Sequence, residues 1–249
     1  MTSKLLKKIV GALGYKLFDK NYIENTRLIS RNSSLTIKTL LNFFFENKYI
    51  DNLIQIGAND GENFDELSKF IKKYKINSIL VEPIDEHFQN LKNIYSTYKN
   101  VILEKVAISD DDKKKYLYSV KKKVRQNYGS HAKAISSFNF NHLTKHGIKK
   151  KHIEKVRVNT SSIKRLIEKH KLDKVDLFFC DAEGYDGEII LSFLNCSINC
   201  KIVVFEFIHV ENKILKKVIN NLEKENYQLF PINENLVCIK KNIEILLKN

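Results

Sequence analysis

A glycine-containing turn follows the first apolar run that reads as a strand. Segment 53–62 reads LIQIGANDGE, and it passes from that strand into a turn that opens an amphipathic helix. Glycine has no side chain, so a ligand can approach the backbone closely there. Glu82 ends the next apolar run, where a carboxylate can accept hydrogen bonds from both hydroxyls of a ribose. The two features together predict a nucleoside site.

The turn differs from the fingerprint of nicotinamide dinucleotide sites. That fingerprint requires glycine at the positions of Gly57, Asn59 and Glu62, and only the first is present. S-adenosylmethionine carries no pyrophosphate. It needs only a permissive turn beside its methionine part and an acid for its ribose. We therefore expect S-adenosylmethionine as the nucleoside.

Acidic residues at the end of a later strand can supply a base. Methyl transfer to an alcohol requires an aligned acceptor oxygen and removal of its proton. Asp181 and Glu183 directly follow the apolar run 175–180, and closely spaced acids can raise one pKa toward neutrality. We expect Asp181 to act as the base or to orient the acceptor, with Glu183 beside it. The alternative is that both acids cap the following helix or bind the loop backbone.

Two further groups of residues are candidates for acceptor contacts. Glu206 and His209 lie at the end of the apolar run 202–207, and substrate contacts are expected at the carboxyl edge of an open sheet. A basic central segment contributes histidines that could act as a base, although a surface histidine in such a loop is more often inert. These histidines are His131, His142, His146 and His152.

The elements that hold these residues alternate along the chain. From residue 52, apolar runs of strand length alternate with amphipathic stretches, which predicts βαβ units and a parallel sheet. Two closing strands read as an antiparallel hairpin. The expected fold is therefore α/β and Rossmann-like, with a mostly parallel seven-stranded sheet and helices on both faces. The predicted strands are 53–56, 78–81, 101–108, 175–180, 202–207, 227–231 and 236–239, and the helices are 64–74, 88–95, 161–170, 185–194 and 212–224.

Two segments depart from this alternation. Residues 1–50 have helical periodicity and predict an N-terminal helical extension to a single domain over 51–249, with a second helix at 35–45. Lysines around the apolar stripe of residues 1–18 could contact an anionic membrane surface, although packing against the sheet is favoured. Residues 121–155 are polar, basic and weakly periodic. They predict a substrate-facing insertion, about 120–155, rather than a sheet element.

Several segments resemble the motifs of FkbM-type S-adenosylmethionine-dependent methyltransferases. Their order and spacing also match, and together they cover roughly residues 51–210. They are QIGANDG at 55–61, VEP at 81–83, KVAISD at 105–110 and KVDLFFCDAEGYD at 174–186.

The resemblance implies a class I methyltransferase fold, S-adenosylmethionine as cofactor, and O-methylation of a hydroxyl on a sugar, glycan or small metabolite. It implies that the glycine turn lines the methionine side, Glu82 binds the ribose and Ala107 borders the adenine. Gln55 stands where many such enzymes have an acid, and Asp60 is the candidate substitute for binding the cofactor's ammonium. The cofactor residues implied are Gln55, Gly57, Ala58, Asn59, Asp60, Gly61, Glu82, Pro83 and Ala107.

Charge leaves other functions open. The formal net charge is +14, which admits a nucleic-acid partner, but the lysines are spread over the whole chain as on an ordinary solvated surface. Nucleic-acid amino methyltransferases usually need an Asn/Asp-Pro-Pro-aromatic turn, and the only prolines are Pro83 and Pro231. We expect a small-molecule or glycan acceptor. An RNA methyltransferase and a non-catalytic cofactor-binding or membrane-associated assembly module are the alternatives.

Cysteine usage and hydropathy bear on the cellular location of the protein. No apolar run approaches the roughly 20 residues of a membrane span, and the basic start is a poor signal peptide. The cysteines form no CxxC pair and have no histidine at metal spacing, so we expect neither a zinc site nor a disulfide framework. Reduced thiols fit a cytoplasmic protein, with residues 1–18 as a candidate contact with the inner face of the membrane. The cysteines are Cys180, Cys196, Cys200 and Cys238.

Overall fold

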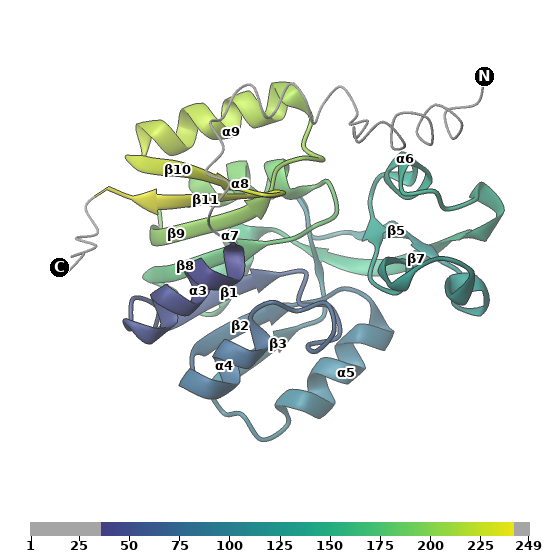
Figure 1. The fold of residues 1–249 in the computed structure, drawn as a ribbon, viewed down its shortest axis with the longest axis horizontal. Coiled ribbons are helices and arrows are strands. Elements are labelled where there is room, and N and C mark those ends of the chain that lie inside the picture. Colours follow the sequence, from purple (N-terminus) through teal and green to yellow (C-terminus); the bar gives the residue numbers. More distant parts are fainter. Residues whose placement is uncertain (1–35, 242–249) are drawn as a thin grey trace, which may run out of the picture.

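A seven-stranded sheet forms the centre of the molecule (Figure 1). The computed structural model describes residues 36–241. The strand order is β10-β11-β9-β8-β1-β2-β3, and β11 alone runs antiparallel to its neighbours. This confirms the predicted mostly parallel sheet and its C-terminal hairpin. The strands are β1 Asn52–Ile56, β2 Asn77–Val81, β3 Val101–Glu104, β8 Lys174–Cys180, β9 Asn199–Glu206, β10 Tyr227–Ile232 and β11 Asn235–Lys240.

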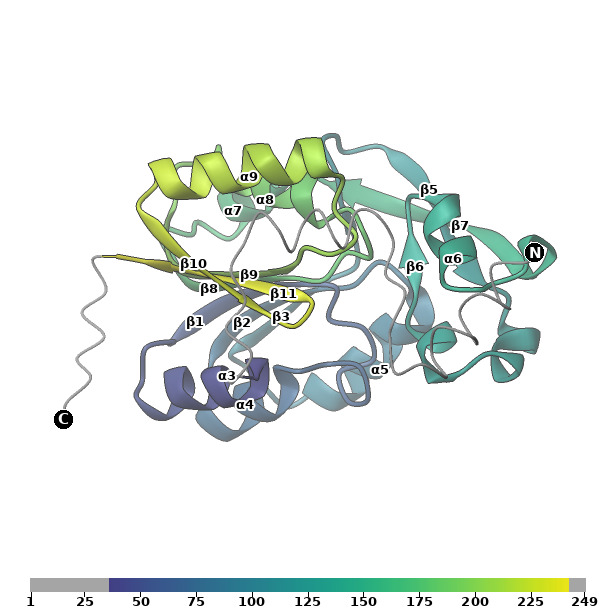
Figure 2. The ribbon, with the colours of Figure 1, turned by 45° about the horizontal axis from the view of Figure 1, so that its top comes forward.

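Helices cover both faces of this sheet, as predicted (Figure 2). Strand β8 shows why its sequence is apolar throughout. Phe178 packs on one face against Phe193 of α8, with ring centroids 3.9 Å apart, while Leu177 and Phe179 enter the core on the other face. One face carries α3 Ile37–Glu46, α4 Ser68–Tyr74 and α5 Asp85–Tyr95, and the other carries α7 Ile163–Lys169, α8 Asp186–Leu194 and α9 Asn212–Lys224.

The order of the strands creates a crevice beside β1. The chain passes from β1 to β2 and β3 on one side and later returns to β8 on the other side. Ligands bind at such a switch point because the connecting loops diverge from the carboxyl ends of the strands. Hydrogen bonds hold these ends together: the Gly57 N–H donates to the carbonyl of Val81, and the Asp181 N–H donates to that of Ile56, both at 3.0 Å.

A second sheet lies beside this crevice, at the carboxyl end of the central strands (Figure 1). The prediction that 121–155 lacks sheet elements is wrong, since β6 and the start of β7 fall within it. The predicted strand 101–108 is in fact two strands in different sheets. The order is β4-β7-β5-β6, with β4 Ala107–Ile108, β5 Lys114–Val120, β6 Ser136–Ser137 and β7 Ile153–Ser161.

Charged residues at exposed positions explain why these strands were not predicted. Burial along β5 and β7 is intermittent, with lysines at exposed positions, and a small apolar core lies beneath them. The core includes Val120, Leu143 and Ile148, so it draws on α6 and a loop as well as on the strands. The insertion also contains α6 Phe140–Lys145 and the 3₁₀ helices η1 Lys122–Asn127, η2 Ser130–Lys133 and η3 Lys150–His152.

The N-terminal prediction is only partly covered by the described residues. Helix α3 corresponds to the predicted helix 35–45 and packs Leu41, Phe44 and Phe45 into the core. The predicted first helix and the membrane contact through residues 1–18 lie outside the described residues. Between residues 36 and 241, no helix has the length and hydropathy needed to cross a bilayer.

Candidate active site

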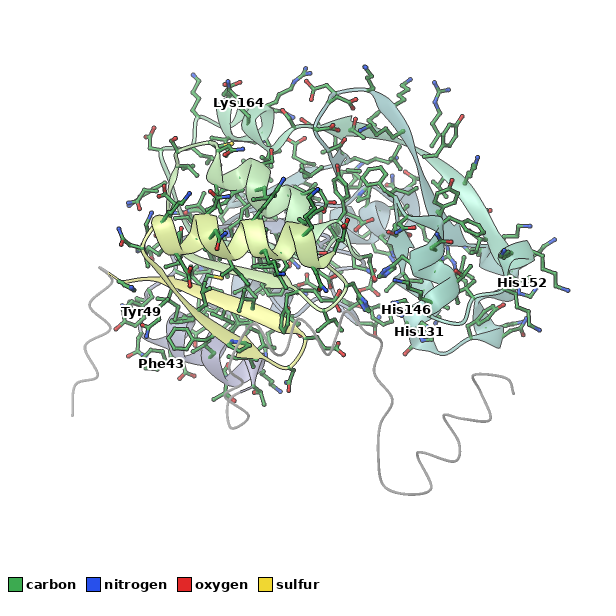
Figure 3. The ribbon with its side chains drawn as sticks, turned by 90° about the horizontal axis from the view of Figure 1, so that it is seen from above. Phe43, Tyr49, His131, His146, His152 and Lys164 are labelled. Carbon is green, nitrogen blue, oxygen red and sulfur yellow. The ribbon has the colours of Figure 1, made fainter. Side chains whose placement is uncertain are left out.

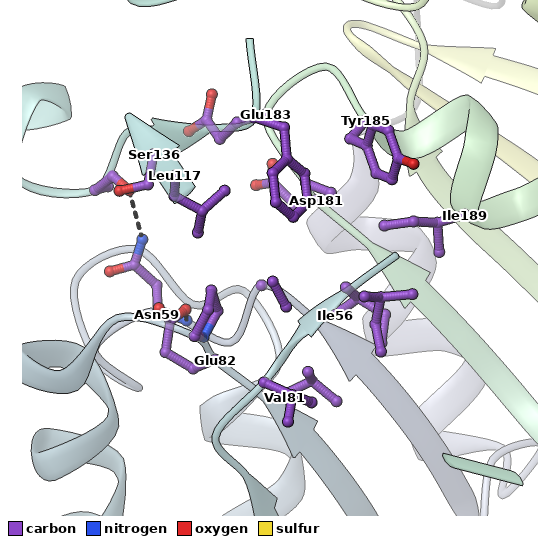
Figure 4. Close-up of a pocket in the computed structure, with 18 residues that line it drawn as sticks. Ile56, Asn59, Val81, Glu82, Leu117, Ser136, Asp181, Glu183, Tyr185 and Ile189 are labelled. Carbon is purple, nitrogen blue, oxygen red and sulfur yellow. Dashed lines mark hydrogen bonds between the residues drawn. The ribbon is translucent and has the colours of Figure 1, made fainter. Parts of the chain in front are cut away.

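The crevice contains a pocket above the carboxyl ends of β1, β2 and β8 (Figure 4). Its empty space is about 620 Å³, including the part that is open to solvent. Gly57, Asn59 and Glu82 line it from the first two strand ends. Asp181 and Glu183 line it from the end of β8. We call this space the first pocket.

Gly57 is required by the close approach of two strand ends. Its φ is +81°, and a Cβ built on it would lie 2.0 Å from the backbone oxygen of Asp181. Any other residue would therefore push β1 away from β8. Asn59 also has positive φ, at +49°, which lets its N–H point at the Glu82 carboxylate, 3.0 Å away. The turn thus shapes the floor of the pocket with backbone atoms.

Glu82 is a buried carboxylate held by backbone donors. Its side chain is only 4% exposed; Oε2 accepts from the Asn59 N–H, and Oε1 accepts from the Ile84 N–H at 2.8 Å. Each oxygen keeps a second lone pair for a ligand. Burial raises the pKa of Glu82 to about 7, although both backbone bonds oppose this shift. A ligand that donates hydrogen bonds here would favour the ionised form.

A second pocket adjoins the first and shares Gly57, Asn59, Asp181 and Glu183 with it. Asp65, Glu66 and Glu234 also line it, which makes five carboxylates around one space, and neither lysine nor arginine is among its lining residues in the described chain. A strongly basic protein therefore has an acidic pocket. Such a pocket attracts a cationic ligand.

Asp65 is a site residue that the sequence analysis missed. The Gln55 Nε2 donates to Asp65 Oδ1 at 3.0 Å, and the N–H of Leu67 donates to the same oxygen at 2.8 Å. Burial raises the pKa of Asp65. Within the described residues, Asp65 Oδ2 and Gln55 Oε1 are buried and have no hydrogen-bond partner. The fold thus places a carboxylate beside Gln55 from a residue ten positions later in the sequence.

Asp181 and Glu183 lie on a turn held by a third acid. The buried Asp186 accepts from the Ala182 N–H at 3.0 Å and from the Gly184 N–H at 3.2 Å. Asp186 therefore caps this turn, which leaves the Asp181 side chain open to both pockets. Enclosure at the sheet edge and the neighbouring Glu183 carboxylate both raise the pKa of Asp181. An acid with a raised pKa is suited to accept a proton.

Glu183 connects the pocket to a group of histidines. Its Oε2 lies 2.9 Å from Nε2 of His142, which belongs to α6 of the insertion. His146 and His209 pack beside His142, with ring centroids 4.6 and 4.9 Å away. Burial lowers the pKa of both His142 and His146 to about 4, so these rings are neutral at pH 7.

The other two predicted histidines lie elsewhere. His131 lines the second pocket, whereas His152 contacts the hydroxyl of Tyr128. Figure 3 shows His131 near His146, and His152 at a different end of the insertion. Only His131 is therefore placed to reach a ligand in the second pocket directly.

Most predicted cofactor residues meet at the two pockets, but three do not. Ala58 is fully buried in the core, and Gly61 packs against Leu91 of α5. Asp60 accepts from the N–H groups of Glu62 and Asn63 in its own turn, at 3.0 and 2.9 Å. The predicted residues that line a pocket are Gln55, Gly57, Asn59, Glu82, Pro83, Ala107, Asp181 and Glu183.

The predicted acceptor residues Glu206 and His209 lie outside both pockets, with Glu206 Oε1 and His209 Nε2 3.7 Å apart. The insertion instead lines the first pocket through Ser136 and Phe138. The Phe138 ring meets that of Tyr185 edge-on, with centroids 5.2 Å apart. The prediction of a substrate-facing insertion named neither residue, because the periodicity around 136–138 is weak.

A sequence-family comparison identifies the domain. The family model described as the methyltransferase FkbM domain matches residues 55–229, which is more than half of the chain. The chain belongs to the FkbM methyltransferase family. The match includes the glycine turn, Glu82, the insertion and the Asp181 turn, so it contains the whole lining of the first pocket and all of the second except Glu234 and Asn235. No match was found among curated protein sequences.

The fold is similar to that of an FkbM methyltransferase of known structure, at low sequence identity. The FkbM methyltransferase of Methylobacillus flagellatus KT is 12% identical, with a TM-score of 0.50, and the match covers 90% of this chain and 56% of that one. This FkbM chain thus spans little more than half of that protein. The SAH-bound methyltransferase PaMTH1 of Podospora anserina is 10% identical over 96% of each chain, with a TM-score of 0.46.

Proposed function

We propose that this FkbM domain transfers a methyl group from S-adenosylmethionine to a hydroxyl of a sugar, glycan or small metabolite. The observation that carries the proposal is the position of Glu82, a buried carboxylate at the first pocket beside a turn that only glycine can form. Asp181 lies across the same space. A ribose acceptor and a proton acceptor thus line one pocket.

The described residues fit this cofactor. Glu82 has lone pairs for the ribose hydroxyls, and Pro83 and Ala107 offer an apolar surface for the adenine. At the methionine end, Gln55 Oε1 and Asp65 Oδ2 are buried acceptors without partners in the described chain, so they fit an ammonium donor. This assigns to Asp65 the role first expected of Asp60.

When bound, S-adenosylmethionine supplies a methyl group on a positively charged sulfonium. The carboxylates of the second pocket stabilise positive charge there. Asp181 would hold the proton that the acceptor hydroxyl loses, while the methyl group would pass from sulfur to oxygen and S-adenosylhomocysteine would be the leaving group. The raised pKa of Asp181 suits it to hold that proton near neutral pH.

The acceptor is inferred from the walls of the pockets. The insertion presents small, polar or aromatic side chains to them, such as Ser130, Ser136 and Phe138, and its lysines face elsewhere. An acidic pocket repels phosphate, which disfavours an RNA backbone at the reacting position. This supports a neutral hydroxyl acceptor more than the RNA alternative or a strongly anionic sugar.

Titration calorimetry with S-adenosylhomocysteine tests the cofactor site. We expect binding by the wild type and a loss of about 1.5–3 kcal/mol in Glu82→Gln, because an amide accepts hydrogen bonds from a ribose less well than a carboxylate. Glu62→Gln removes an exposed acid from the same loop and should bind normally. Equal affinity in Glu82→Gln and Glu62→Gln would remove Glu82 from the site.

Transfer of labelled methyl groups tests the reaction. The wild type should label members of a panel of glycans, polyols and hydroxylated metabolites, and should leave RNA unlabelled. A non-catalytic binding module predicts S-adenosylhomocysteine binding with no label on any acceptor. Label on RNA alone would replace the proposed acceptor class.

A further inference from the structure

Three histidines from separate segments converge beside Glu183. His142 lies in α6, His146 caps the C-terminus of α6, and His209 lies in the loop after β9. One ring nitrogen from each lies within 4.8 Å of those from the other two. Such convergence places three nitrogen ligands around one point.

The local fold favours this arrangement. Residues four apart on a helix share a face, so α6 points His142 and His146 in the same direction. Asn139 caps the start of α6, where its side chain accepts from the Asn141 N–H at 2.9 Å, and Leu143 anchors the helix in the insertion core. Gly184 leaves room for the rings, since a Cβ there would lie 3.1 Å from Nδ1 of His142.

Carboxyl groups lie beside the imidazole rings, as they do at many metal sites. Metal-binding histidines usually donate their other ring N–H to a carboxylate, which fixes the tautomer. His142 Nε2 lies 2.9 Å from Glu183, so donation there leaves Nδ1 as the basic nitrogen of a neutral ring. Glu206 lies 3.7 Å from His209 Nε2 on the other side of the cluster. A cation bound by the three rings would have carboxyl groups on two sides of it.

We infer that His142, His146 and His209 bind a divalent transition metal of the Zn²⁺ class. Three imidazoles are a ligand set that Zn²⁺ prefers, and they leave a fourth position open. The metal would join the insertion to the loop after β9 and hold Glu183 at the edge of both pockets. The sequence analysis expected no metal; the spacing of His142 and His146 was the signal for one.

Metal content tests the site directly. We would incubate the full chain with ZnSO₄, dialyse it against metal-free buffer, and measure zinc by atomic emission. We expect equimolar zinc in the wild type and in His152→Gln, which removes an imidazole from elsewhere in the insertion. His146→Gln and His209→Gln should each retain less than a tenth of that amount. Glu183→Gln should weaken zinc binding about 10- to 100-fold, because it removes the carboxylate that orients the His142 ring.

Two further measurements keep the test decisive. Metal-free melting curves identify variants that fail to fold, and Co²⁺ loaded into the wild type should give visible bands that change in His209→Gln. Mg²⁺ should not compete, because it prefers oxygen ligands. Substoichiometric zinc in the wild type, or equal zinc in folded His209→Gln and His152→Gln, would overturn the inference. Binding of S-adenosylhomocysteine is scored separately, so either proposal can fail alone.

Discussion

The two sides of the crevice are built differently. On the β1–β2 side, the Gly57 turn and Glu82 lie in short contiguous motifs, and backbone N–H groups hold the carboxylate. On the β8 side, Glu183 meets a side chain from the insertion, that of His142, which is 41 residues away in sequence. The first side is fixed by local geometry, and the second depends on how two sheets pack together.

This difference separates two tasks. The β1–β2 side has backbone donors and the buried carboxylate of Glu82, which suit a constant ligand. The β8 side concentrates titratable groups whose pKa values are raised first by burial and then by neighbouring carboxylates, as for Asp181. Reactive and variable parts of a site benefit from such adjustable surroundings. We therefore expect substitutions on the β1–β2 side to affect ligand binding and folding, and substitutions on the β8 side to affect turnover.

The largest expected effect is on turnover from the β8 side. Asp181→Asn keeps the shape but removes the proton acceptor, so kcat should fall about 100- to 10,000-fold while S-adenosylhomocysteine affinity stays within about threefold. Glu188→Gln, a partly buried acid on the following helix, is the matched control. Radiolabel transfer to an accepted substrate gives the rate. Full activity in Asp181→Asn would contradict the proposal that the β8 side governs turnover.

The next effect is on stability from the β1 side. Gly57→Ala adds a Cβ that collides with the Asp181 backbone, and the positive φ adds strain, so unfolding free energy should drop by about 2–4 kcal/mol. Gly147→Ala has a similar φ of +84° but open space around it, and should cost only about 1 kcal/mol. Urea denaturation measures both. Equal costs would mean that the strand ends separate easily.

A third test uses the pKa of Glu82, about 7. The ligand needs the carboxylate, so wild-type affinity for S-adenosylhomocysteine should increase about fivefold to tenfold from pH 6 to pH 8, whereas Glu82→Gln should change little. Without ligand, the free energy of unfolding should instead decrease from pH 6 to pH 8. The folded pKa lies above the usual 4.5, so this contribution is present below pH 4.5 and lost as the pH rises through 7. Calorimetry and melting at both pH values check the two signs.

The smallest effect concerns the contact between insertion and core. Phe138 and Tyr185 meet edge-on, and such pairs couple by about 0.5–1.5 kcal/mol. A double-mutant cycle with Phe138→Leu and Tyr185→Leu, read by urea denaturation, should give that coupling. A coupling near zero would show that the two sides of the crevice pack independently.

Sequence reasoning was most accurate where pattern and structure are local. The predicted strands 53–56 and 78–81 match β1 and β2 to within one residue, because short apolar runs bounded by turn residues define a buried strand. It failed in the insertion, where Lys155, Arg157 and Asn159 occupy exposed positions of β7 and make the strand look polar. It also placed Asp60 at the cofactor, whereas that carboxylate binds its own turn.

The sequence by itself determined the alternation of strands and helices, the glycine turn and the acid at the end of β2, since each depends on residues close together in the chain. Only the tertiary structure decided that Asp65 bonds to Gln55, that Asp186 rather than Asp181 caps the turn, and that three histidines meet beside Glu183. Those contacts depend on how two sheets pack. Packing results from many weak interactions spread along the chain, so it cannot be predicted from a short motif.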